Sequence, residues 1–411
     1  MMTERLEAFY GLPEEVNFCK KCVISNQRPS STIEFKNEKG EKKSVINFND
    51  EGVCSACVYH DEKETGIDWI VRDKKLVELL AKFRSNDGSY DIIVPGSGGK
   101  DSAFTSHLLK YKYGMNPLTV TWAPHLYTDI GNKNFQEWMH TGGLDNILYT
   151  PNGKLHKEMT KNAFHNLLHP FQPFIVGQRI IGPAMAKRFG VKLVMYGENQ
   201  AEYGNSIEGN TNPIMNMDFF SSDDALNMKF GGITMQEYID SGKYTKDDFS
   251  PYIPPNKKDL IESGVEVHYL GYYVKWDPQE CYYYSVENTG FEANPERTEG
   301  TYSKYSSIDD KIDPFHYLTT LIKFGIGRCT YDAAQEVRND KITREEAAYL
   351  VKKYDTEFPH KYFKEFLSYI DSTEDEFWET VNSHRSPHIW KKVDDEWKLR
   401  HTVFKDGTDD C

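Results

Sequence analysis

The sequence predicts an α/β protein built on a doubly wound parallel sheet, with a cysteine-rich segment before it and a helical region after it. Between residues 63 and 290, short apolar strands alternate with segments of helical periodicity. Two CxxC pairs lie within the first 62 residues, and short helical patterns follow one another from residue 313 to about 383. A chain of 411 residues is long enough for two or three such units.

We expect three regions: a leader and metal knuckle (1–62), a nucleotide-binding α/β domain (63–290) with an insertion at about 205–262, and a substrate loop with a helical C-terminal region (291–411). Asp68 is a candidate N-cap for the first helix, and TREE at Thr343 predicts a capping box. The expected strands are 90–95, 117–123, 146–150, 192–197 and 265–276, and the expected helices between them are 131–141, 154–168 and 175–189.

The charge balance and the hydropathy exclude some classes of function. Lys and Arg number 49 against 63 Asp and Glu, which gives a net charge of −14. Such a surface repels nucleic-acid backbones, so we expect no nucleic-acid partner. No apolar run is long enough for a bilayer span, and the first residues do not resemble a signal peptide. We therefore expect a cytoplasmic protein without a membrane partner.

The cysteines indicate a metal site. Cys19 and Cys22 are separated by 31 residues from Cys54 and Cys57, a pattern that favours a closed four-cysteine Zn²⁺ site. An iron–sulfur cluster is the alternative. His60 could replace one cysteine, although a surface histidine is the simpler interpretation. A site closed by four thiolates leaves no open position, so its role would be structural.

The strongest single motif is the turn after the first expected strand, Ser97-Gly98-Gly99-Lys100-Asp101-Ser102. Glycines allow successive N–H groups to face one concavity, and the following helix N-terminus adds positive charge. Lys100 would neutralise phosphate, Ser97 and Ser102 would donate hydrogen bonds, and Asp101 could hold Mg²⁺. The spacing is not that of a Walker A loop. It resembles the PP-loop of ATP pyrophosphatases, which cleave ATP between the α- and β-phosphates.

Further candidates lie at strand ends and in the C-terminal region. Trp122, with Ala123, could contact adenine, or could simply pack in the core. Glu198 and Asn199 could orient the substrate amide or a metal, with turn capping as the alternative. Three more candidates could stabilise departing pyrophosphate, or could form surface ion pairs: Lys323, Arg328 and Asp332. Two loop cations could bind a sugar carboxylate or a nucleotide phosphate, or could be solvated: Arg297 and Lys304.

Longer motifs lie along about residues 18 to 350. They include CKKCV (19–23), DEGVCSAC (50–57), VPGSGGKDS (94–102), TWAPHLYTDIG (121–131), HPFQPFIVGQ (169–178), YGENQAEYGN (196–205), YVKWDPQECYYYSVENTGF (273–291), RTEGTYSKYSSIDDKID (297–313) and KFGIGRCTYDAAQEVRNDKITREEA (323–347). Together these motifs resemble the N-acetyl sugar amidotransferase family of lipopolysaccharide, pseudaminic or legionaminic acid and flagellin-sugar biosynthesis. The resemblance implies a PP-loop (adenine nucleotide alpha-hydrolase-like) fold and conversion of a sugar acetamido group to acetamidino with ATP and ammonia.

The ammonia source is expected to be a separate protein. A class II glutaminase needs an N-terminal cysteine, whereas Thr3 follows two methionines. Cys281 and Cys329 do not lie on the Gly-flanked elbow of a class I glutaminase. The family resemblance suggests partners similar to the glutaminase and cyclase subunits of histidine biosynthesis.

Two other functions compete with this one. Some PP-loop enzymes thiolate tRNA and also carry CxxC pairs, but they need a basic RNA-binding face and a reactive cysteine pair. The negative net charge and the lack of a CxxC after residue 57 count against that function. A non-catalytic scaffold that only docks a glutaminase is disfavoured by the intact loop motif.

Overall fold

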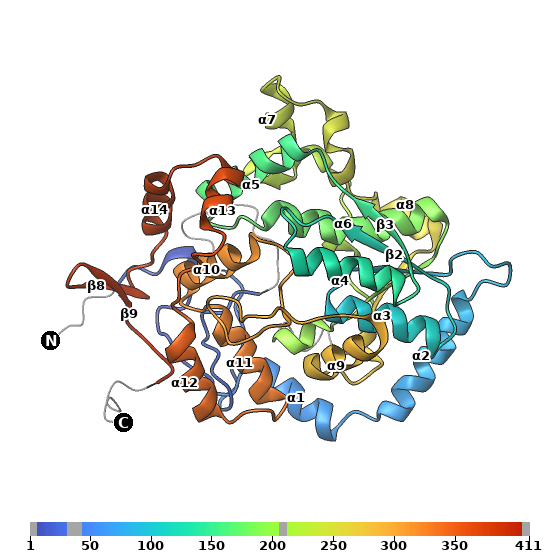
Figure 1. The fold of residues 1–411 in the computed structure, drawn as a ribbon, viewed down its shortest axis with the longest axis horizontal. Coiled ribbons are helices and arrows are strands. Elements are labelled where there is room, and N and C mark those ends of the chain that lie inside the picture. Colours follow the sequence, from blue (N-terminus) through green and yellow to red (C-terminus); the bar gives the residue numbers. More distant parts are fainter. Residues whose placement is uncertain (1–5, 31–42, 205–211, 405–411) are drawn as a thin grey trace.

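The computed structural model describes residues 6–30, 43–204 and 212–404, and a five-stranded parallel sheet forms its centre (Figure 1). The sheet order is β3-β2-β1-β4-β7, and every neighbouring pair is parallel. In that order the strands are Asp145–Tyr149, Pro117–Trp122, Ile92–Pro95, Leu193–Tyr196 and Glu266–Tyr269. The predicted α/β class with a parallel sheet is therefore confirmed.

Helices cover both faces of the sheet because alternate strand residues point to opposite sides. Ile92 and Val94 of β1 pack in one apolar cluster with residues of α2, α3 and α9, whereas Ile93 packs in another with residues of α5 and α6. On the first face lie α2 (Trp69–Phe83), α3 (Lys100–Tyr111), α4 (Asp129–His140) and α9 (Pro278–Thr289). On the second lie α5 (Gly153–Leu167) and α6 (Gln172–Phe189). The sheet is doubly wound, as expected.

Local sequence signals set the ends of several helices. The side chain of Asp68 accepts hydrogen bonds from the N–H groups of Ile70 and Val71, so it caps α2 as predicted. Thr343 forms the predicted capping box with Glu346 at the start of α12. These two caps show that short-range polar signals located helix starts correctly.

The last strand is shorter than predicted. We expected it to run from 265 to 276, but β7 ends at Tyr269 and a 3₁₀ turn, Leu270–Tyr272, follows. The N–H of Gly271 donates to the carbonyl of Gly197 at 2.8 Å, which ties this turn to the loop after β4. The aromatic residues beyond Tyr269 are buried through this turn, so their apolar character imitated a longer strand.

The cysteine-rich segment is part of the main core. The segment contains few aliphatic residues, yet Val23, Ile24 and Ile46 pack in the same apolar cluster as α6 and α10. Helix α1 (Ser55–Thr65) continues this segment. Of the predicted insertion, residues 205–211 lie outside the described residues. The remainder includes β5 (Lys229–Phe230), β6 (Ile233–Thr234), α7 (Met235–Asp240) and α8 (Lys257–Ser263).

The C-terminal region is helical as predicted and lies beside the sheet domain (Figure 1). The helices of this region are α10 (Asp313–Phe324), α11 (Arg328–Arg338), α12 (Arg344–Tyr354), α13 (Phe363–Ile370) and α14 (Glu374–Ser383). A two-stranded antiparallel hairpin, β8 (Trp390–Val393) and β9 (Glu396–Leu399), follows the helices and was not predicted.

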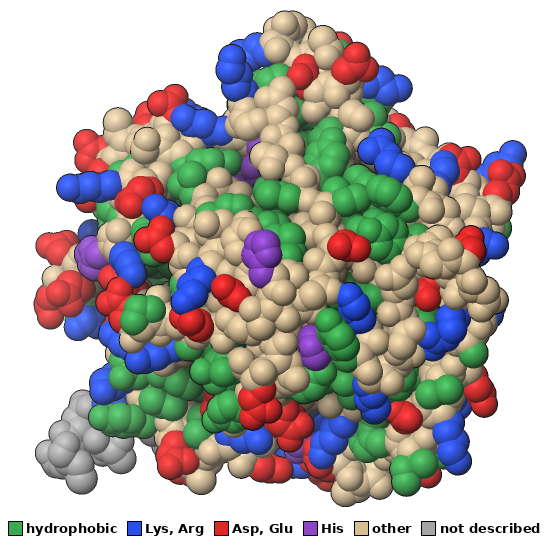
Figure 2. All heavy atoms as spheres, turned by 45° about the vertical axis from the view of Figure 1, so that its right-hand side comes forward, with side chains coloured by type: hydrophobic (Ala, Val, Ile, Leu, Met, Phe, Trp, Pro, Cys, Tyr) green, Lys and Arg blue, Asp and Glu red, His purple; other side chains and the backbone are tan. Residues whose placement is uncertain are grey.

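Neither a membrane-spanning helix nor, on the face in Figure 2, a basic stripe is found among the described residues. Among the described residues, no helix is both long and apolar enough to cross a membrane. On the face in Figure 2, Lys and Arg side chains are interspersed with Asp and Glu, and apolar side chains gather toward the upper right. This face therefore lacks the continuous positive charge that a phosphate backbone requires.

Candidate active site

A cleft of about 710 Å³ lies at the carboxyl ends of β1 and β4. In the order β3-β2-β1-β4-β7, the chain leaves these two neighbouring strands toward opposite faces of the sheet, which makes a topological switch point. Ligands of open α/β sheets bind at such points. The loops after both strands line the cleft, and α10, α11 and the N-terminal segment complete its walls.

The loop after β1 can be built only with glycine at two positions. Gly98 has a φ of +82°, and a Cβ there would lie 2.8 Å from the Cα of Phe135 on α4. A Cβ on Gly96 would lie 2.1 Å from the Cβ of Ser102. The N–H of Gly98 donates to the Oγ of Ser102 at 3.2 Å, and that hydroxyl donates to the carbonyl of Gly99. Ser102 therefore holds the loop in its shape.

Lys100 begins α3 and faces two carboxylates. Its Nζ lies 2.5 Å from Oδ2 of Asp101. Burial alone would lower the pKa of Lys100, but the charges of Asp101 and Glu198 outweigh it and raise that pKa. The ammonium is therefore fixed as a cation at the helix N-terminus, where an anion is also favoured by the helix dipole.

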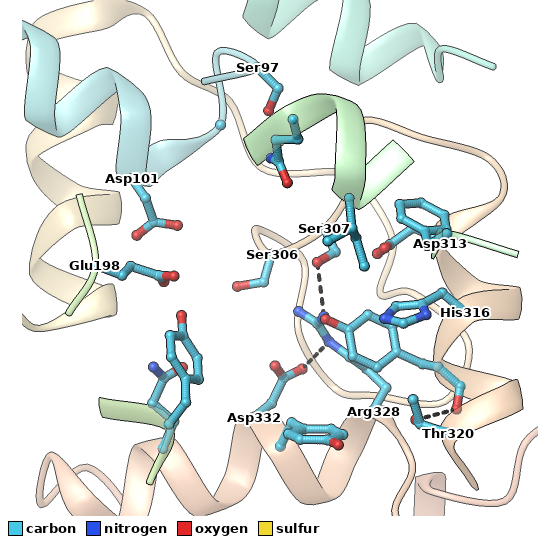
Figure 3. Close-up of a pocket in the computed structure, with 18 of the residues that line it drawn as sticks. Ser97, Asp101, Glu198, Ser306, Ser307, Asp313, His316, Thr320, Arg328 and Asp332 are labelled. Atoms are coloured by element: carbon cyan, nitrogen blue, oxygen red, sulfur yellow. Dashed lines mark hydrogen bonds and ion pairs between the residues drawn. The ribbon is translucent and has the colours of Figure 1, made fainter. Parts of the chain in front are cut away.

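Asp101 lies in the first turn of α3 and Glu198 in the loop after β4, and the two carboxylates lie on the same side of the cleft (Figure 3). Oδ1 of Asp101 is buried and has no hydrogen-bond partner among the described residues. Burial, and then the negative charge of Asp101, raise the pKa of Glu198 to about 7, although Lys100 and a hydrogen bond with Tyr203 act in the other direction. The pair therefore carries negative charge that the protein only partly compensates.

The opposite wall of the cleft comes from α10 and α11. Nε of Arg328 lies 3.0 Å from Oδ2 of Asp332, and a second nitrogen donates to the Oγ of Ser307 at 2.9 Å (Figure 3). Burial would lower the pKa of Arg328, but the neighbouring carboxylates raise it. The carboxylate of Asp355 accepts the N–H groups at the start of α11 and so fixes the helix turn that carries Arg328.

Most of the residues that the sequence singled out come together in this cleft. Their shared environment is the carboxyl edge of the sheet and the facing helices. Those that line it are Ser97, Gly98, Gly99, Lys100, Asp101, Ser102, Glu198, Lys323, Arg328 and Asp332. Lys323 is buried, and its Nζ donates to the carbonyl of Leu167 at 2.8 Å. The structure thus places these residues together, while the role of each stays a prediction.

Four expected ligand contacts do not line the cleft. The indole of Trp122 is buried in the core and stacks on Tyr149, so core packing explains it. Asn199 caps the 3₁₀ helix Gln200–Tyr203 and also donates to the hydroxyl of Tyr59, the alternative role considered for it. The two loop cations, Arg297 and Lys304, also lie outside the set of residues that line the cleft.

The two loop cations are held by other groups. Arg297 makes a two-point ion pair with the carboxylate of Glu357, at 2.6 and 2.8 Å. The Nζ of Lys304 donates to the carbonyl of Pro295 at 2.9 Å. Sequence reasoning selected these charges because their loop contains few apolar residues, but the chain uses them to fix the loop itself.

Several lining residues were not selected from the sequence. Asp309 accepts a hydrogen bond from Ser97 of the loop. Asp313 is buried beside Arg328, and burial raises its pKa to about 8. Both lie in the motif RTEGTYSKYSSIDDKID (297–313), and the resemblance of this motif to the family was the signal that could have identified them. Tyr203 and Arg28 also line the cleft, and no local pattern distinguished them.

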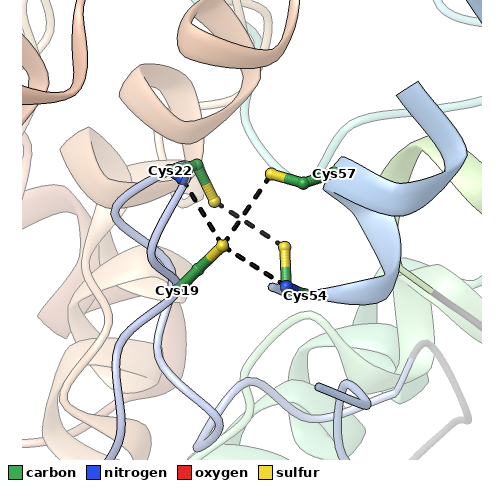
Figure 4. Close-up of side chains that lie close together, drawn as sticks. All are labelled: Cys19, Cys22, Cys54 and Cys57. Carbon is green, nitrogen blue, oxygen red and sulfur yellow. Dashed lines mark hydrogen bonds between the residues drawn. The ribbon is translucent and has the colours of Figure 1, made fainter. Parts of the chain in front are cut away.

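The four paired cysteines form one buried group (Figure 4). All four Sγ atoms lie within 4.8 Å of one another, with 3.7 Å between Cys22 and Cys54 and 3.9 Å between Cys19 and Cys57. The Sγ of Cys19 also accepts backbone N–H groups from residues 21, 22 and 54. Such a group could hold a metal ion. His60 is not among these ligands.

The other two described cysteines are poor nucleophiles. Cys281 and Cys329 are buried, and burial raises the pKa of each thiol well above its ordinary value. Cys411 lies outside the described residues. Such burial of Cys281 and Cys329 disfavours the thiolate that a glutaminase nucleophile needs.

The fold and site define an α/β protein with a candidate anion-binding loop at a topological switch point. Comparison with known families identifies a similarity in the C-terminal region. Residues 299–403 match the family described as "LPS biosynthesis protein WbpG-like, C-terminal domain". This match confirms, over that part of the chain, the resemblance to proteins of surface-polysaccharide biosynthesis. The matched region contains Arg328 and Asp332 on the cleft wall.

One curated relative matches a shorter segment. An uncharacterized protein of Methanocaldococcus jannaschii, MJ1599, is 32% identical over 78 residues. The aligned segment covers 19% of this chain and 27% of that protein. The chain therefore spans only about a quarter of the length of this relative.

Solved structures with partial likeness include three proteins. NMN synthetase from Francisella tularensis is 12% identical, with 69% of this chain and 96% of that chain covered and a TM-score of 0.27. The U34-tRNA thiolase NcsA from Methanococcus maripaludis, with its [4Fe-4S] cluster, is 13% identical, with coverage of 78% and 89% and a TM-score of 0.28. NH₃-dependent NAD synthetase from Campylobacter jejuni is 12% identical, with coverage of 70% and 95% and a TM-score of 0.27. The fold assignment rests on the sheet order of this chain itself.

Proposed function

We propose that the protein is an ATP-dependent amidotransferase that converts the acetamido group of an N-acetylated bacterial surface sugar to acetamidino. The observation that carries the proposal is the loop of β1, where Lys100 faces Asp101 and Glu198 in a cleft at the switch point. The WbpG-like region supplies the opposite wall of the same cleft. The description of that family supports a role in lipopolysaccharide biosynthesis.

The carboxylates suit Mg²⁺ bound with ATP. Oxygen ligands are those Mg²⁺ prefers, and Oδ1 of Asp101 is buried without a partner among the described residues. Glu198 lies close enough for its pKa to be raised by the charge of Asp101. Asp101 and Glu198 would hold the ion, which would neutralise charge on the phosphates. Binding of a cation there would also remove the repulsion between the two carboxylates.

The residues of the cleft would act on developing charge. The acetamido oxygen attacks the α-phosphate of ATP, and the bond to the β-phosphate breaks with release of pyrophosphate. Lys100 and the loop N–H groups stabilise that departing charge. Loss of the amide proton leaves an O-adenyl imidate. Ammonia adds to its carbon, AMP leaves with the original acetamido oxygen, and an acetamidine remains.

The cysteine group suits a single structural Zn²⁺ ion. A tetrahedral site with Zn–S bonds of about 2.3 Å has S–S edges of about 3.8 Å. The distances of 3.7 and 3.9 Å agree with this edge. An iron–sulfur cluster places its inorganic core between the thiolates and would hold them farther apart, so the geometry favours one ion. Its contribution would be to folding, because four thiolates complete its coordination.

Ammonia would come from partner proteins. Both cysteines outside the paired group in the described residues are buried with raised thiol pKa values, so neither is placed to form a glutamyl thioester. We propose a separate glutaminase with a cyclase-like channel subunit, similar to those of histidine biosynthesis. The resemblance of the longer motifs to the sugar amidotransferases supports this choice.

The test is a reaction with ATP, Mg²⁺, an ammonium salt and a panel of N-acetylated nonulosonic acids and nucleotide-linked sugars. We expect AMP and pyrophosphate to form in step with a sugar product in which NH replaces oxygen, detected by mass spectrometry. ADP formation, or AMP formation without a change in any sugar, would contradict the proposal. Omitting ammonium provides the control for the second half of the reaction.

A further inference from the structure

An arginine on the N-terminal wall of the cleft is not used by the chemistry above. Arg28 lines the cleft and is 7% exposed. Its guanidinium lies 5.9 Å from the ring centre of Tyr203 and 5.7 Å from that of Tyr331. The described residues offer its side chain neither a hydrogen bond nor an ion pair, and Nη1 is buried without a partner. A buried charge in this state costs free energy unless an anion meets it.

Three other cations of the cleft are already engaged. Lys100 is paired with Asp101, and Arg328 with Asp332. Lys323 donates to a backbone carbonyl. Arg28 differs from these three, because the aromatic rings that flank it supply only a weak cation–π attraction. Its charge therefore remains available to a ligand that enters the cleft.

A second arginine makes the local charge more positive. Arg338 also lines the cleft and donates to the carbonyl of Glu202 at 3.1 Å. Burial lowers the pKa of Arg28, the phenol of Tyr331 counteracts this, and the charge of Arg338 lowers it further. Arg338 thus adds positive charge next to Arg28, while its own Nη2 is engaged by the carbonyl of Glu202.

Tyr203 links the position of Arg28 to that of the reacting carboxylates, and this indicates which part of a substrate Arg28 could contact. Tyr203 bonds Glu198 through its hydroxyl and presents its ring toward Arg28. One tyrosine side chain therefore separates the carboxylates, where the acetamido group would react, from the guanidinium. A sugar ring that lies along Tyr203 would place its acetamido group near Glu198 and another of its substituents near Arg28. The triphosphate of ATP would instead lie on the loop of Lys100, at the start of α3.

We propose that Arg28 binds an anionic group, a carboxylate or a phosphate, attached directly to the ring of the acceptor sugar. A guanidinium forms paired hydrogen bonds with either group, and the buried setting strengthens them. The inference rests on the proposed function for the placement of the acceptor. It adds that Arg28 recognises the charge of such an acceptor and selects it over neutral N-acetylated sugars.

The experiment compares three probes on the wild-type protein and on Arg28→Gln in the presence of a non-hydrolysable ATP analogue. The probes are N-acetylglucosamine, its 1-phosphate and N-acetylneuraminic acid, and calorimetry measures their binding. We expect one anionic probe to bind at least tenfold more tightly than the neutral one. The Arg28→Gln change should remove roughly 10- to 100-fold of that affinity, as expected for hydrogen bonds to a charged group. The better anionic probe then identifies a phosphate or a carboxylate.

Controls separate this inference from the proposed function. The melting temperature and metal content of Arg28→Gln should match those of the wild type. Arg28→Lys, which keeps the charge, should retain part of the preference for the anionic probe. Binding of the ATP analogue should be unchanged, and a parallel loss there would assign Arg28 to ATP and overturn the inference. The inference would also be overturned if neither anionic probe bound more tightly than N-acetylglucosamine, or if the tighter binding persisted in Arg28→Gln. Arg28-dependent binding without AMP formation would support the site and count against the amidotransferase reaction.

Discussion

The four-cysteine group and the carboxylates of the cleft differ in how far their polar atoms are satisfied within the protein. In the cysteine group, all four Sγ atoms face one another, are buried, and are close enough to share one ion. In the cleft, Asp101 keeps a carboxylate oxygen without a partner among the described residues, and Glu198 has a pKa raised to about 7. The first cluster is closed on itself, whereas the second faces a cavity.

The difference separates stability from chemistry. A closed site gains its full interaction energy during folding, so its loss should lower the free energy of unfolding. An open site leaves part of its electrostatic energy to be gained when phosphate and cation arrive, so its loss should lower the reaction rate. The predictions that follow test whether changes in the two clusters separate in this way.

The largest effect is expected at the loop. Lys100→Ala and Asp101→Asn should each lower the rate of AMP formation by roughly 10²- to 10³-fold, because both groups act on phosphate and metal charge. Their melting temperatures should remain near that of the wild type. Lys110→Ala on the same helix is the matched control and should leave the rate unchanged. AMP formation near the wild-type rate in either loop variant would remove the loop from the mechanism.

The next effect is expected at the cysteine group and should appear first in stability. Cys22→Ser should lower the metal content and the melting temperature, because one ligand of a closed site is lost. Cys329→Ser, which changes an equally buried cysteine outside the group, controls for burial of a hydroxyl. Metal analysis of the wild type should give one ion per chain. A fully active sample with neither zinc nor iron would refute the site.

A smaller effect concerns pH. The pKa of Glu198 is about 7 in the folded protein against an ordinary value of 4.5, so the folded state retains a proton that the unfolded chain loses. Without Mg²⁺, stability should therefore fall as pH rises between about 4.5 and 7, by at most about 1.4 kcal/mol per pH unit. Glu198→Gln should flatten this dependence in denaturant titrations, and Mg²⁺ should weaken it. An unchanged slope in the variant would assign the dependence to other groups.

The smallest effect is expected for the single cysteines. Cys281→Ala and Cys329→Ala should leave ammonium-dependent turnover nearly unchanged, and the wild-type chain alone should not use glutamine. Turnover with ammonium should rise with pH as NH₃ replaces NH₄⁺. Amidine formation from glutamine by the purified chain, stopped by either variant, would show that our interpretation of these thiols is mistaken.

Local patterns predicted much of the fold and part of the site. The alternation of strands and helices, the loop motif and the two CxxC pairs each depend on residues close in sequence, and the structure contains all three. Asp313 and Arg28 were missed because their importance comes from neighbours brought by the tertiary fold. Conversely, the charge of Arg297 suggested a ligand site, but its carboxylate partner Glu357 lies 60 residues away in sequence.

The central claim, attack of the acetamido oxygen on the α-phosphate, can be followed with an isotope. An acceptor labelled with ¹⁸O in its acetamido carbonyl is incubated with ATP, Mg²⁺ and ammonium, and the released nucleotide and phosphate are analysed by mass spectrometry. The account predicts that each amidine formed leaves its ¹⁸O in AMP, with unlabelled pyrophosphate. Label in inorganic phosphate together with ADP, or AMP without label, would contradict it.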